Sequence, residues 1–190
     1  MSDHLVRAPR WVRLAVAALF TVIFAVVLVK SVQSDGRSLG FAFGVNWLLM
    51  AWAIVVGRLV LFRFPSNYYR LRRFEKDGRI YDRLGVRWYQ RSFRRFVWSV
   101  NLSLVRSQLD GRAKVMESTY DPESGHLYIF LIITGITLRA AALGWWDSVA
   151  WLLLFNLLHN GYPVMSMRQL RARLVAGQRG SHVDFDRGGV

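Results

Sequence analysis

Long apolar runs alternate with arginine-rich segments along the chain. Four such runs occupy residues 11–29, 41–62, 127–146 and 149–165. Each approaches the roughly 20 apolar residues that a helix needs to cross a hydrocarbon core of about 30 Å. The pattern therefore predicts an all-α integral membrane protein with four transmembrane helices.

The third and fourth runs are separated only by the short segment Gly144-Trp145-Trp146-Asp147. So short a connection makes two successive helices antiparallel neighbours. Tryptophan is enriched where a helix meets the membrane–water interface. We therefore expect a tight helical hairpin that carries its tryptophans at the membrane surface.

The basic residues lie mainly outside the apolar runs. The chain has 26 Lys and Arg against 12 Asp and Glu, a formal net charge of +14. Most of these cations fall between Arg63 and Gly125, and a smaller group follows Met165. Because cytoplasmic loops carry an excess of Lys and Arg, we expect a multi-pass protein of the cell (inner or plasma) membrane. Both termini and the segment between the second and third spans are expected in the cytoplasm.

That long basic segment also contains aromatic residues interleaved with arginine, among them Tyr68, Tyr69, Trp88 and Tyr89. This composition is typical of amphipathic helices that lie on a membrane surface, and we expect such helices over about residues 66–105. Two interpretations stay open. The surface either only holds the protein against anionic lipid or also binds substrate.

Residues 1–175 are expected to form a single membrane domain. Residues 176–190 contain Gly, Ser and Asp but few apolar residues, which predicts a disordered cytoplasmic tail. The chain has no cysteine, so thiol nucleophiles and disulfides are excluded. It also lacks zinc-finger, basic-zipper and aromatic RNA-binding motifs. We therefore expect membrane lipid, and not nucleic acid, to be the partner of the positive charge.

Three polar residues interrupt the fourth apolar run. Asn156, His159 and Asn160 are spaced i, i+3 and i+4 and so share one face of a helix. Polar side chains inside a span are costly and mark candidate functional sites. The alternative is that they only join helices through hydrogen bonds.

A second polar pair, Glu123 and His126, stands at the start of the third run with i, i+3 spacing. The expected orientation puts this end of the third span and the end of the fourth on the cytoplasmic side. The hairpin is therefore expected to bring His126 and His159 to similar depth. We predict a cytoplasm-facing pocket of two imidazoles, one carboxylate and two amides.

Several cations and one tyrosine are candidate substrate-binding residues. Arg139 lies 13 residues beyond His126, about 20 Å deeper at 1.5 Å per residue. We expect its side chain to face the bundle interior. There it would pair with a polar group or hold a polar part of a membrane-embedded ligand. At the end of the fourth run, Tyr162 precedes Arg168 and Arg171, which are i, i+3. These arginines either anchor the helix at the headgroups or hold the phosphates of an anionic donor.

Four sequence blocks resemble the glycosyl-4,4'-diaponeurosporenoate acyltransferase family, membrane enzymes that place a fatty acyl chain on the sugar of a glycosylated carotenoid. The blocks are FPSNYY (64–69), FEKDGRIYDRLGVRWYQR (74–91), ESGH (123–126) and GWWDSVAWLLLFNLLHNGYPVMSMRQLRARL (144–174). The family's Glu-x-x-His pair, two asparagines, Tyr-Pro and Arg-x-x-Arg fall on the candidate residues above. The chain departs from the family pattern at Met167 and at Gln169-Leu170.

The resemblance implies transfer of a fatty acyl chain to a hydroxyl of a glycosylated carotenoid or related glycolipid. Acyl transfer needs a base for the hydroxyl and donors for the oxyanion. We expect His126 to be the base, oriented by Glu123, and Asn156, Asn160 or His159 to donate to the oxyanion. No serine stands in a nucleophile elbow, which favours direct transfer. No cofactor or metal is expected, and the acyl donor is acyl-CoA or an acyl carrier.

Two alternatives remain from the residues alone. Glu123, His126 and His159 resemble a two-His-one-carboxylate metal set, which would suit a metal-dependent membrane hydrolase or oxidase. The chain could instead be a small non-catalytic subunit that binds carotenoid or lipid in a larger complex, with its polar cluster used for packing.

Overall fold

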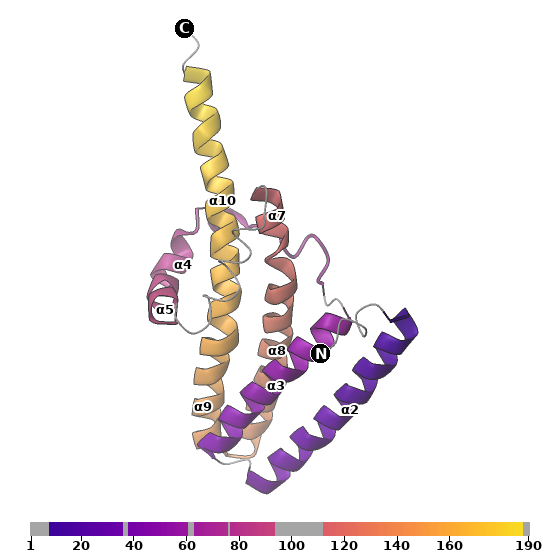
Figure 1. Cartoon of the computed structure of the whole chain (residues 1–190). Helices are drawn as coiled ribbons and strands as arrows, with labels where there is room; N and C mark the ends of the chain where they lie inside the picture. Colours follow the sequence, from indigo (N-terminus) through magenta and orange to yellow (C-terminus); the bar gives the residue numbers. More distant parts are fainter. Residues whose placement is uncertain (1–7, 36–37, 61–62, 76, 94–111, 188–190) are drawn as a thin grey trace. The chain divides into compact units, whose positions relative to one another are not determined.

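The computed structural model describes residues 8–35, 38–60, 63–75, 77–93 and 112–187, and the regular secondary structure within these ranges is all helical (Figure 1). This confirms the all-α fold class. The elements in chain order are α2 (Arg10–Asp35), α3 (Leu39–Leu59), η1 (Arg73–Glu75), α4 (Arg79–Arg83), α5 (Val86–Phe93), α7 (Arg112–Glu117), α8 (Tyr120–Ala142), α9 (Trp146–Asn156), the π-helical η3 (Leu157–Gly161) and α10 (Tyr162–Arg187).

The chain divides into two compact units, whereas one membrane domain was expected. Unit 1 comprises Met1–Arg63 and Ser124–Gly161, and unit 2 comprises Phe64–Glu123 and Tyr162–Val190. Unit 1 therefore contains α2, α3, most of α8, α9 and η3. Unit 2 contains the short helices between the second and third apolar runs, the first turn of α8, and α10.

In the part of the chain that the structure describes, three helices are long and apolar enough to cross a membrane: Arg10–Ser31, Leu39–Gly57 and Val115–Ala142. They correspond to the first three predicted spans and support a membrane protein. The fourth predicted span, residues 149–165, is divided among α9, η3 and the start of α10. A fourth crossing and the orientation of the chain stay predictions.

The π-helical stretch has a local cause in the sequence. Pro163 follows it closely, and proline cannot donate the backbone hydrogen bond that continues an α-helix. Its ring also crowds the carbonyl of the preceding turn. Widening that turn to a π-helix relieves the crowding, and such single π-turns occur frequently at functional sites.

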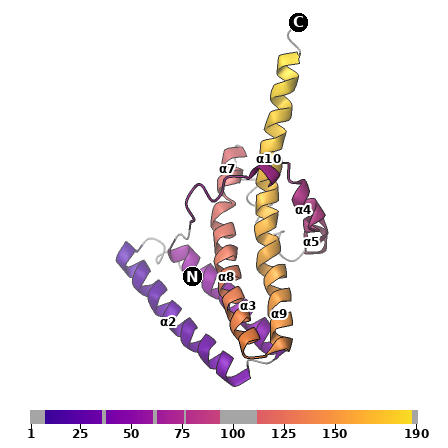
Figure 2. The same ribbon diagram turned by 180° about the vertical axis from the view of Figure 1, so that it is seen from behind.

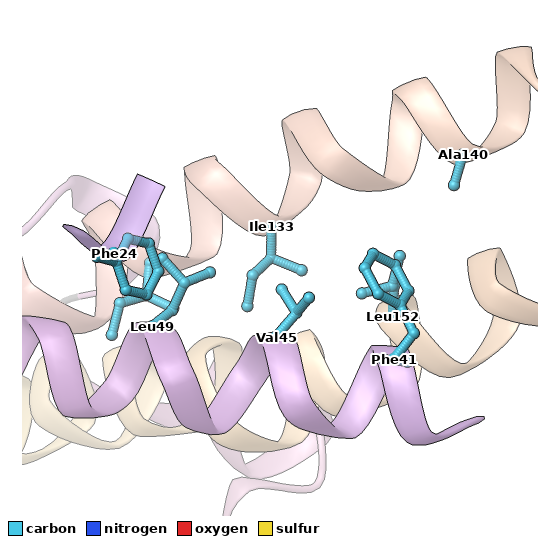
Figure 3. Close-up of a cluster of buried hydrophobic side chains, with 9 residues drawn as sticks. Phe24, Phe41, Val45, Leu49, Ile133, Ala140 and Leu152 are labelled. Atoms are coloured by element: carbon cyan, nitrogen blue, oxygen red, sulfur yellow. The ribbon is translucent and has the colours of Figure 1, made fainter. Parts of the chain in front are cut away.

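Unit 1 is held together by a core of apolar side chains from all its long helices (Figure 3). In Figures 1 and 2, α2 and α3 run side by side with opposite directions. Phe41, Val45 and Leu49 recur every fourth residue on α3 and present one apolar face. Phe24 of α2 packs against this face, and so do Ile129, Ile133, Ala140 and Leu152 from α8 and α9.

The predicted hairpin between α8 and α9 is confirmed. Gly144 follows α8 with φ of 72°, a left-handed conformation that glycine adopts without strain. Its N–H donates to the Ala141 carbonyl at 3.0 Å, and the Trp145 N–H donates to the Ala140 carbonyl at 2.9 Å. These two bonds form a Schellman motif, which ends α8 and turns the chain back after a few residues.

Unit 2 places the aromatic-rich segment against α10 through short helices. On α5, Val86 and Tyr89 are buried while Arg87 and Trp88 are exposed. This is the amphipathic pattern expected for the segment, although its contact with a membrane is not tested. Helices occur at η1, α4 and α5 within the predicted range of 66–105, and residues 94–111 lie outside the described residues.

The last helix extends further than expected. α10 continues to Arg187, whereas the sequence predicted disorder from residue 176. No proline follows Pro163 in the chain, and Gly177 and Gly180 each cost only about 1 kcal/mol in a helix interior. The helix therefore continues through the polar tail, and residues 188–190 lie outside the described residues.

Candidate functional site

A chain of neutral hydrogen bonds lies inside unit 1, where α9 and η3 face α8. Asn156 ends α9 and Asn160 lies in η3, and both side chains are buried. Asn160 Nδ2 donates to Asn156 Oδ1 at 3.0 Å. Asn156 Nδ2 donates to the Phe130 carbonyl at 3.0 Å and to Thr134 Oγ1 at 3.3 Å. The asparagines thus join two helices, as the packing interpretation expected.

The direction of this chain identifies the protonated nitrogen of His126. The Phe130 backbone carbonyl can only accept, so the nitrogen of Asn156 faces it and the oxygen of Asn156 faces Asn160. Asn160 Oδ1 then faces His126 Nδ1 at 3.4 Å, a long contact. Nδ1 of His126 is therefore the donor, and Nε2 of the neutral ring carries the lone pair.

His159 lies in η3 beside an aromatic group. Its Nδ1 is 3.1 Å from the Phe155 carbonyl, which accepts a proton from the ring. Its ring centroid is 6.4 Å from that of Trp47 on α3 and 5.9 Å from that of Phe155. Like His126, it is partly exposed and presents Nε2 as its acceptor. In the neutral form, both imidazoles therefore present Nε2 as the nitrogen that can accept a proton.

Glu123, expected to orient His126, is instead bound by arginines in unit 2. Its Oε1 accepts from Arg168 Nη1 at 3.2 Å, and its Oε2 pairs with Arg171 Nη1. The side chains of Glu123 and Arg171 are fully buried. The structure therefore brings Glu123 to the two arginines and His126 to Asn160.

Arg168 is the centre of this charged cluster. It makes a bidentate pair with Glu75, through Nε at 2.7 Å and Nη2 at 2.8 Å, in addition to its bond to Glu123. The Tyr81 hydroxyl donates to the same Glu75 carboxylate. A guanidinium so engaged has few N–H groups left for a ligand.

Arg171 is enclosed still more completely. Its Nη1 donates to Thr119 Oγ1 at 2.7 Å. Its guanidinium carbon lies 5.8 Å from the ring centroid of Tyr69 and 5.5 Å from that of Tyr120. Its Nε and Nη2 are buried and have no hydrogen-bond partner among the described residues. These cation–π contacts stabilise the charge where hydrogen bonds are missing.

The cluster perturbs the ionisation of its members. Burial acts to raise the pKa of Glu75, but hydrogen bonds from Arg168, Tyr81 and the Arg72 backbone outweigh it and lower the pKa to about 2. Hydrogen bonding to Glu75 raises the pKa of Arg168 above its usual range. Burial, together with the charge of Glu123, raises the pKa of Tyr68 to about 12. Both tyrosine and arginine therefore keep their protons, and Glu75 stays charged.

Tyr162 and Gln169 attach the short helices of unit 2 to α10. The Tyr162 ring stacks on Tyr89 with centroids 4.7 Å apart, and its hydroxyl donates to the Leu84 carbonyl at 3.3 Å. Buried Gln169, one of the departures from the family pattern, donates to Asp82 Oδ1 at 2.6 Å. A substrate-binding role for Tyr162 stays a prediction, and the contacts shown are structural.

The position of Arg139 differs from the expected one, and its substrate-binding role stays a prediction. Arg139 is exposed in the last turn of α8 and does not face the interior of the bundle. A cation at a helix C-terminus is stabilised by the helix dipole, and its long side chain can reach polar surroundings. Arg139 therefore needs no buried partner.

Sequence analysis missed Glu75, Tyr81 and Thr119, which complete the charged cluster. A usable signal was present, because Glu75 is one of few acids in a strongly basic segment and lies within a block that resembles the family. Its partner Arg168 is 93 residues away in the sequence, so the pairing itself could not be predicted from the sequence. Among the described residues, no group of three or more His, Asp and Glu side chains is placed to hold a metal ion.

The geometry can be set beside known proteins. No curated protein and no solved structure matches the chain. A family model described as CrtO, glycosyl-4,4'-diaponeurosporenoate acyltransferase, matches residues 65–177, which is more than half of the chain. This range contains the charged cluster and both candidate histidines. The chain belongs to the glycosyl-4,4'-diaponeurosporenoate acyltransferase family.

Proposed function

We propose that this protein is a membrane acyltransferase that esterifies a hydroxyl of a glycosylated carotenoid, or of a related glycolipid, with a fatty acyl chain. The family supports an acyltransferase that acts on a glycosylated carotenoid. The substrates proposed here are a membrane-embedded acceptor and a cytoplasmic thioester donor, either acyl-CoA or an acyl carrier. The protein itself is proposed to cross the cell membrane four times with both termini in the cytoplasm.

The observation that carries the proposal is the hydrogen-bonded chain from the Phe130 carbonyl through Asn156 and Asn160 to His126. The direction of these bonds makes Nδ1 of His126 the donor, so Nε2 carries the lone pair when the imidazole is neutral. A histidine held in this state can accept a proton near neutral pH.

In the proposed reaction, Nε2 of His126 takes the proton of the sugar hydroxyl while the hydroxyl oxygen attacks the thioester carbonyl carbon. The tetrahedral intermediate collapses with loss of the thiolate, which receives the proton from the imidazolium. The products are an ester and a free thiol, so atoms and charge balance. The second N–H of Asn160 supplies a donor for the oxyanion, because both N–H groups of Asn156 and the Nδ1–H of His159 are already engaged.

An aromatic surface beside His159 suits an acceptor with a long apolar body. Phe43 and Trp47 of α3 lie along one edge, and the Phe155 ring is 5.9 Å from both Phe43 and Trp151. Phe43, Trp47 and Trp151 are exposed. Such a surface is able to hold a polyene or an acyl chain by dispersion and stacking.

The test is mass spectrometry of lipids and pigments from cells that make the glycosylated carotenoid and express the wild type, His126→Ala or His159→Ala. We expect the acyl ester to fall at least about a hundredfold in His126→Ala, the usual contribution of a general base. Protein level in the membrane fraction is measured in parallel. His182→Ala, a histidine in the C-terminal segment, is the matched control and should leave the ester unchanged.

Other outcomes separate the alternatives. Unchanged ester in both His126→Ala and His159→Ala, at equal protein level, contradicts the enzyme proposal and favours the non-catalytic subunit. A loss in His159→Ala alone would assign the base to His159. Activity of the purified protein that disappears with a chelator and returns with added metal would favour the metal-dependent alternative.

A further inference from the structure

Unit 2 contains a partly open cavity of about 410 Å³ that no part of the proposed function yet uses. It is formed where the segment before and within η1 meets α10. The lining residues that matter here are Tyr68, Arg70, Arg72, Phe74, Glu75 and Arg168. Its volume falls within the range of about 300–1,000 Å³ that is typical of small-molecule sites.

The cavity carries an excess of positive charge. Three arginines line it against a single carboxylate, Glu75. Both Glu75 oxygens are occupied, because Oε1 accepts from Arg168 and Tyr81, and Oε2 accepts from Arg168 and from the Arg72 backbone N–H at 2.8 Å. The negative charge of Glu75 is therefore paired with Arg168 and does not pair with the side chain of Arg70 or Arg72.

The two remaining arginines are available to a ligand. Arg70 and Arg72 are exposed, and neither side chain pairs with a carboxylate among the described residues. The backbone around them is fixed, since the Arg72 N–H donates to Glu75 and the Arg70 N–H donates to the Asn67 carbonyl at 3.4 Å. Two guanidinium groups on a fixed backbone beside a cavity suit an anion with several oxygens.

An apolar ring stands beside these cations. Phe74 lines the cavity and is 57% exposed, so one face is open to a planar or apolar ligand group. Tyr68, in contrast to Phe74, is packed against other side chains. Its ring centroid lies 5.4 Å from the Arg168 guanidinium carbon and 4.9 Å from the ring centroid of Phe64. The cavity therefore combines cationic and aromatic lining.

We propose that this cavity binds the phosphorylated head of the acyl donor, with Arg70 and Arg72 on its phosphates and Phe74 against its planar or apolar part. The inference rests on the proposed function. It moves the donor site from Arg168 and Arg171, whose guanidinium groups are engaged by Glu75 and Glu123, to the two arginines that are not. A lipid phosphodiester brings one negative charge, whereas a nucleotide-bearing thioester brings several and also a planar base, which fits two cations and a ring better.

The test measures binding of coenzyme A to the purified full-length protein in nanodiscs of uncharged phosphatidylcholine. Each arginine is expected to make charge-assisted hydrogen bonds to phosphate oxygens, so we expect Arg70→Gln and Arg72→Gln each to raise Kd about tenfold or more. The double variant should raise it further. Phe74→Ala should weaken coenzyme A and leave inorganic pyrophosphate binding unchanged.

The matched control is the double variant Arg83→Gln/Arg91→Gln. It also removes two positive charges, but from exposed positions of the same segment that do not line the cavity. We expect its Kd for coenzyme A to stay within about twofold of the wild type. Equal weakening in both double variants would mean that the effect is general attraction, and the proposal would fail. Absence of coenzyme A binding by the wild type would also overturn it.

Nanodiscs with phosphatidylglycerol distinguish the donor from a lipid headgroup. If the cavity binds a lipid phosphate, phosphatidylglycerol will weaken coenzyme A binding to the wild type, and this weakening will be absent in Arg70→Gln/Arg72→Gln. That result overturns the donor assignment. The binding result is independent of catalysis. If cells form the ester but the Arg70 and Arg72 variants bind coenzyme A with unchanged Kd, only the donor site in the cavity is rejected. If coenzyme A binds normally but no acyl ester forms, the proposed function is rejected.

Discussion

The two units use buried polar groups in opposite ways. In unit 1 the buried polar chain is neutral, since Asn156 and Asn160 link a backbone carbonyl to His126. In unit 2 the buried polar groups are ions, and Arg168 and Arg171 are paired with Glu75 and Glu123. A neutral amide costs much less to bury than a charge. The apolar helices of unit 1 accordingly contain amides, and the arginine-rich unit 2 contains ion pairs.

The difference separates a reactive group from a structural one. The amide chain ends on an imidazole that can still exchange a proton, so it can take part in a reaction. The ion pairs satisfy one another, and breaking one leaves a buried charge uncompensated. We therefore expect changes in unit 2 to act first on stability, and changes in unit 1 to act first on turnover.

The largest effect on stability is expected from Glu123→Ala. This substitution removes the carboxylate that Arg171 and Arg168 share and leaves the enclosed Arg171 with one hydrogen bond, to Thr119. Loss of one partner of a buried pair costs about 3–5 kcal/mol. The measurement is the free energy of unfolding of the purified protein in mixed detergent micelles, and a cost below about 1 kcal/mol would contradict the structural assignment.

The control for this prediction is a surface ion pair in the same unit. Asp77 pairs with Arg79 at 3.4 Å, and their side chains are 54% and 82% exposed. Exposed pairs contribute about 0–1 kcal/mol, so Asp77→Ala should change stability far less than Glu123→Ala. Similar costs for the two variants would mean that burial of the cluster does not determine its strength.

A smaller effect is expected from pH acting on Glu75. Folding lowers the pKa of its carboxyl to about 2, and the unfolded value is about 4.3. A lowered pKa stabilises the folded state above the unfolded value, and this contribution is lost as the pH falls from about 4.5 toward 2. The loss should reach about 2–3 kcal/mol. Unfolding measured across this range should depend less on pH in Glu75→Gln than in the wild type, and identical pH dependence would refute the assignment.

Asn160→Ala should break the neutral chain in unit 1. The substitution leaves Asn156 Oδ1 and His126 Nδ1 without their hydrogen-bond partner. Of the two side chains only Asn156 is fully buried, and an unpaired buried group costs about 1–3 kcal/mol. We expect a loss of about 1–2 kcal/mol in stability and a fall of about tenfold or more in kcat, with KM for the donor unchanged. A raised donor KM at constant kcat would instead place Asn160 at the donor and not behind the base.

The fold could be predicted from the sequence where one helix face or one short turn decided it. The first three apolar runs lie mainly on α2, α3 and α8, and the hairpin at Gly144 has the expected position. The π-helix and the division into two units could not be predicted in this way. They depend on how the turn around Pro163 relaxes and on packing between segments that are distant in the sequence.

The candidate site was predictable in its members and not in its pairings. The spacing of Asn156, His159 and Asn160 indicated a common polar face, and Asn156 and Asn160 are indeed hydrogen-bonded to each other. Glu123 was expected beside His126 because i, i+3 residues share a helix face. Its carboxylate pairs with Arg168 and Arg171 instead, because charge attracts charge more strongly than it attracts a neutral ring, and those partners are 45 or more residues away.

The smallest effect should come from Thr134→Val, which tests whether the amide chain has one essential route. Thr134 Oγ1 accepts from Asn156 at 3.3 Å and donates to the Phe130 carbonyl at 2.7 Å. Thr134 is therefore a second, indirect connection between Asn156 and the Phe130 carbonyl. Asn156 keeps its bond to the Phe130 carbonyl when this connection is removed, and the direction of the chain to His126 is preserved. A hydrogen bond between helices of a membrane protein contributes about 0.6 kcal/mol on average, and we expect a loss of this size with kcat within about twofold of the wild type. A fall in kcat as large as that of Asn160→Ala would mean that Thr134, and not the Phe130 carbonyl, sets the direction of Asn156 and through it the tautomer of His126.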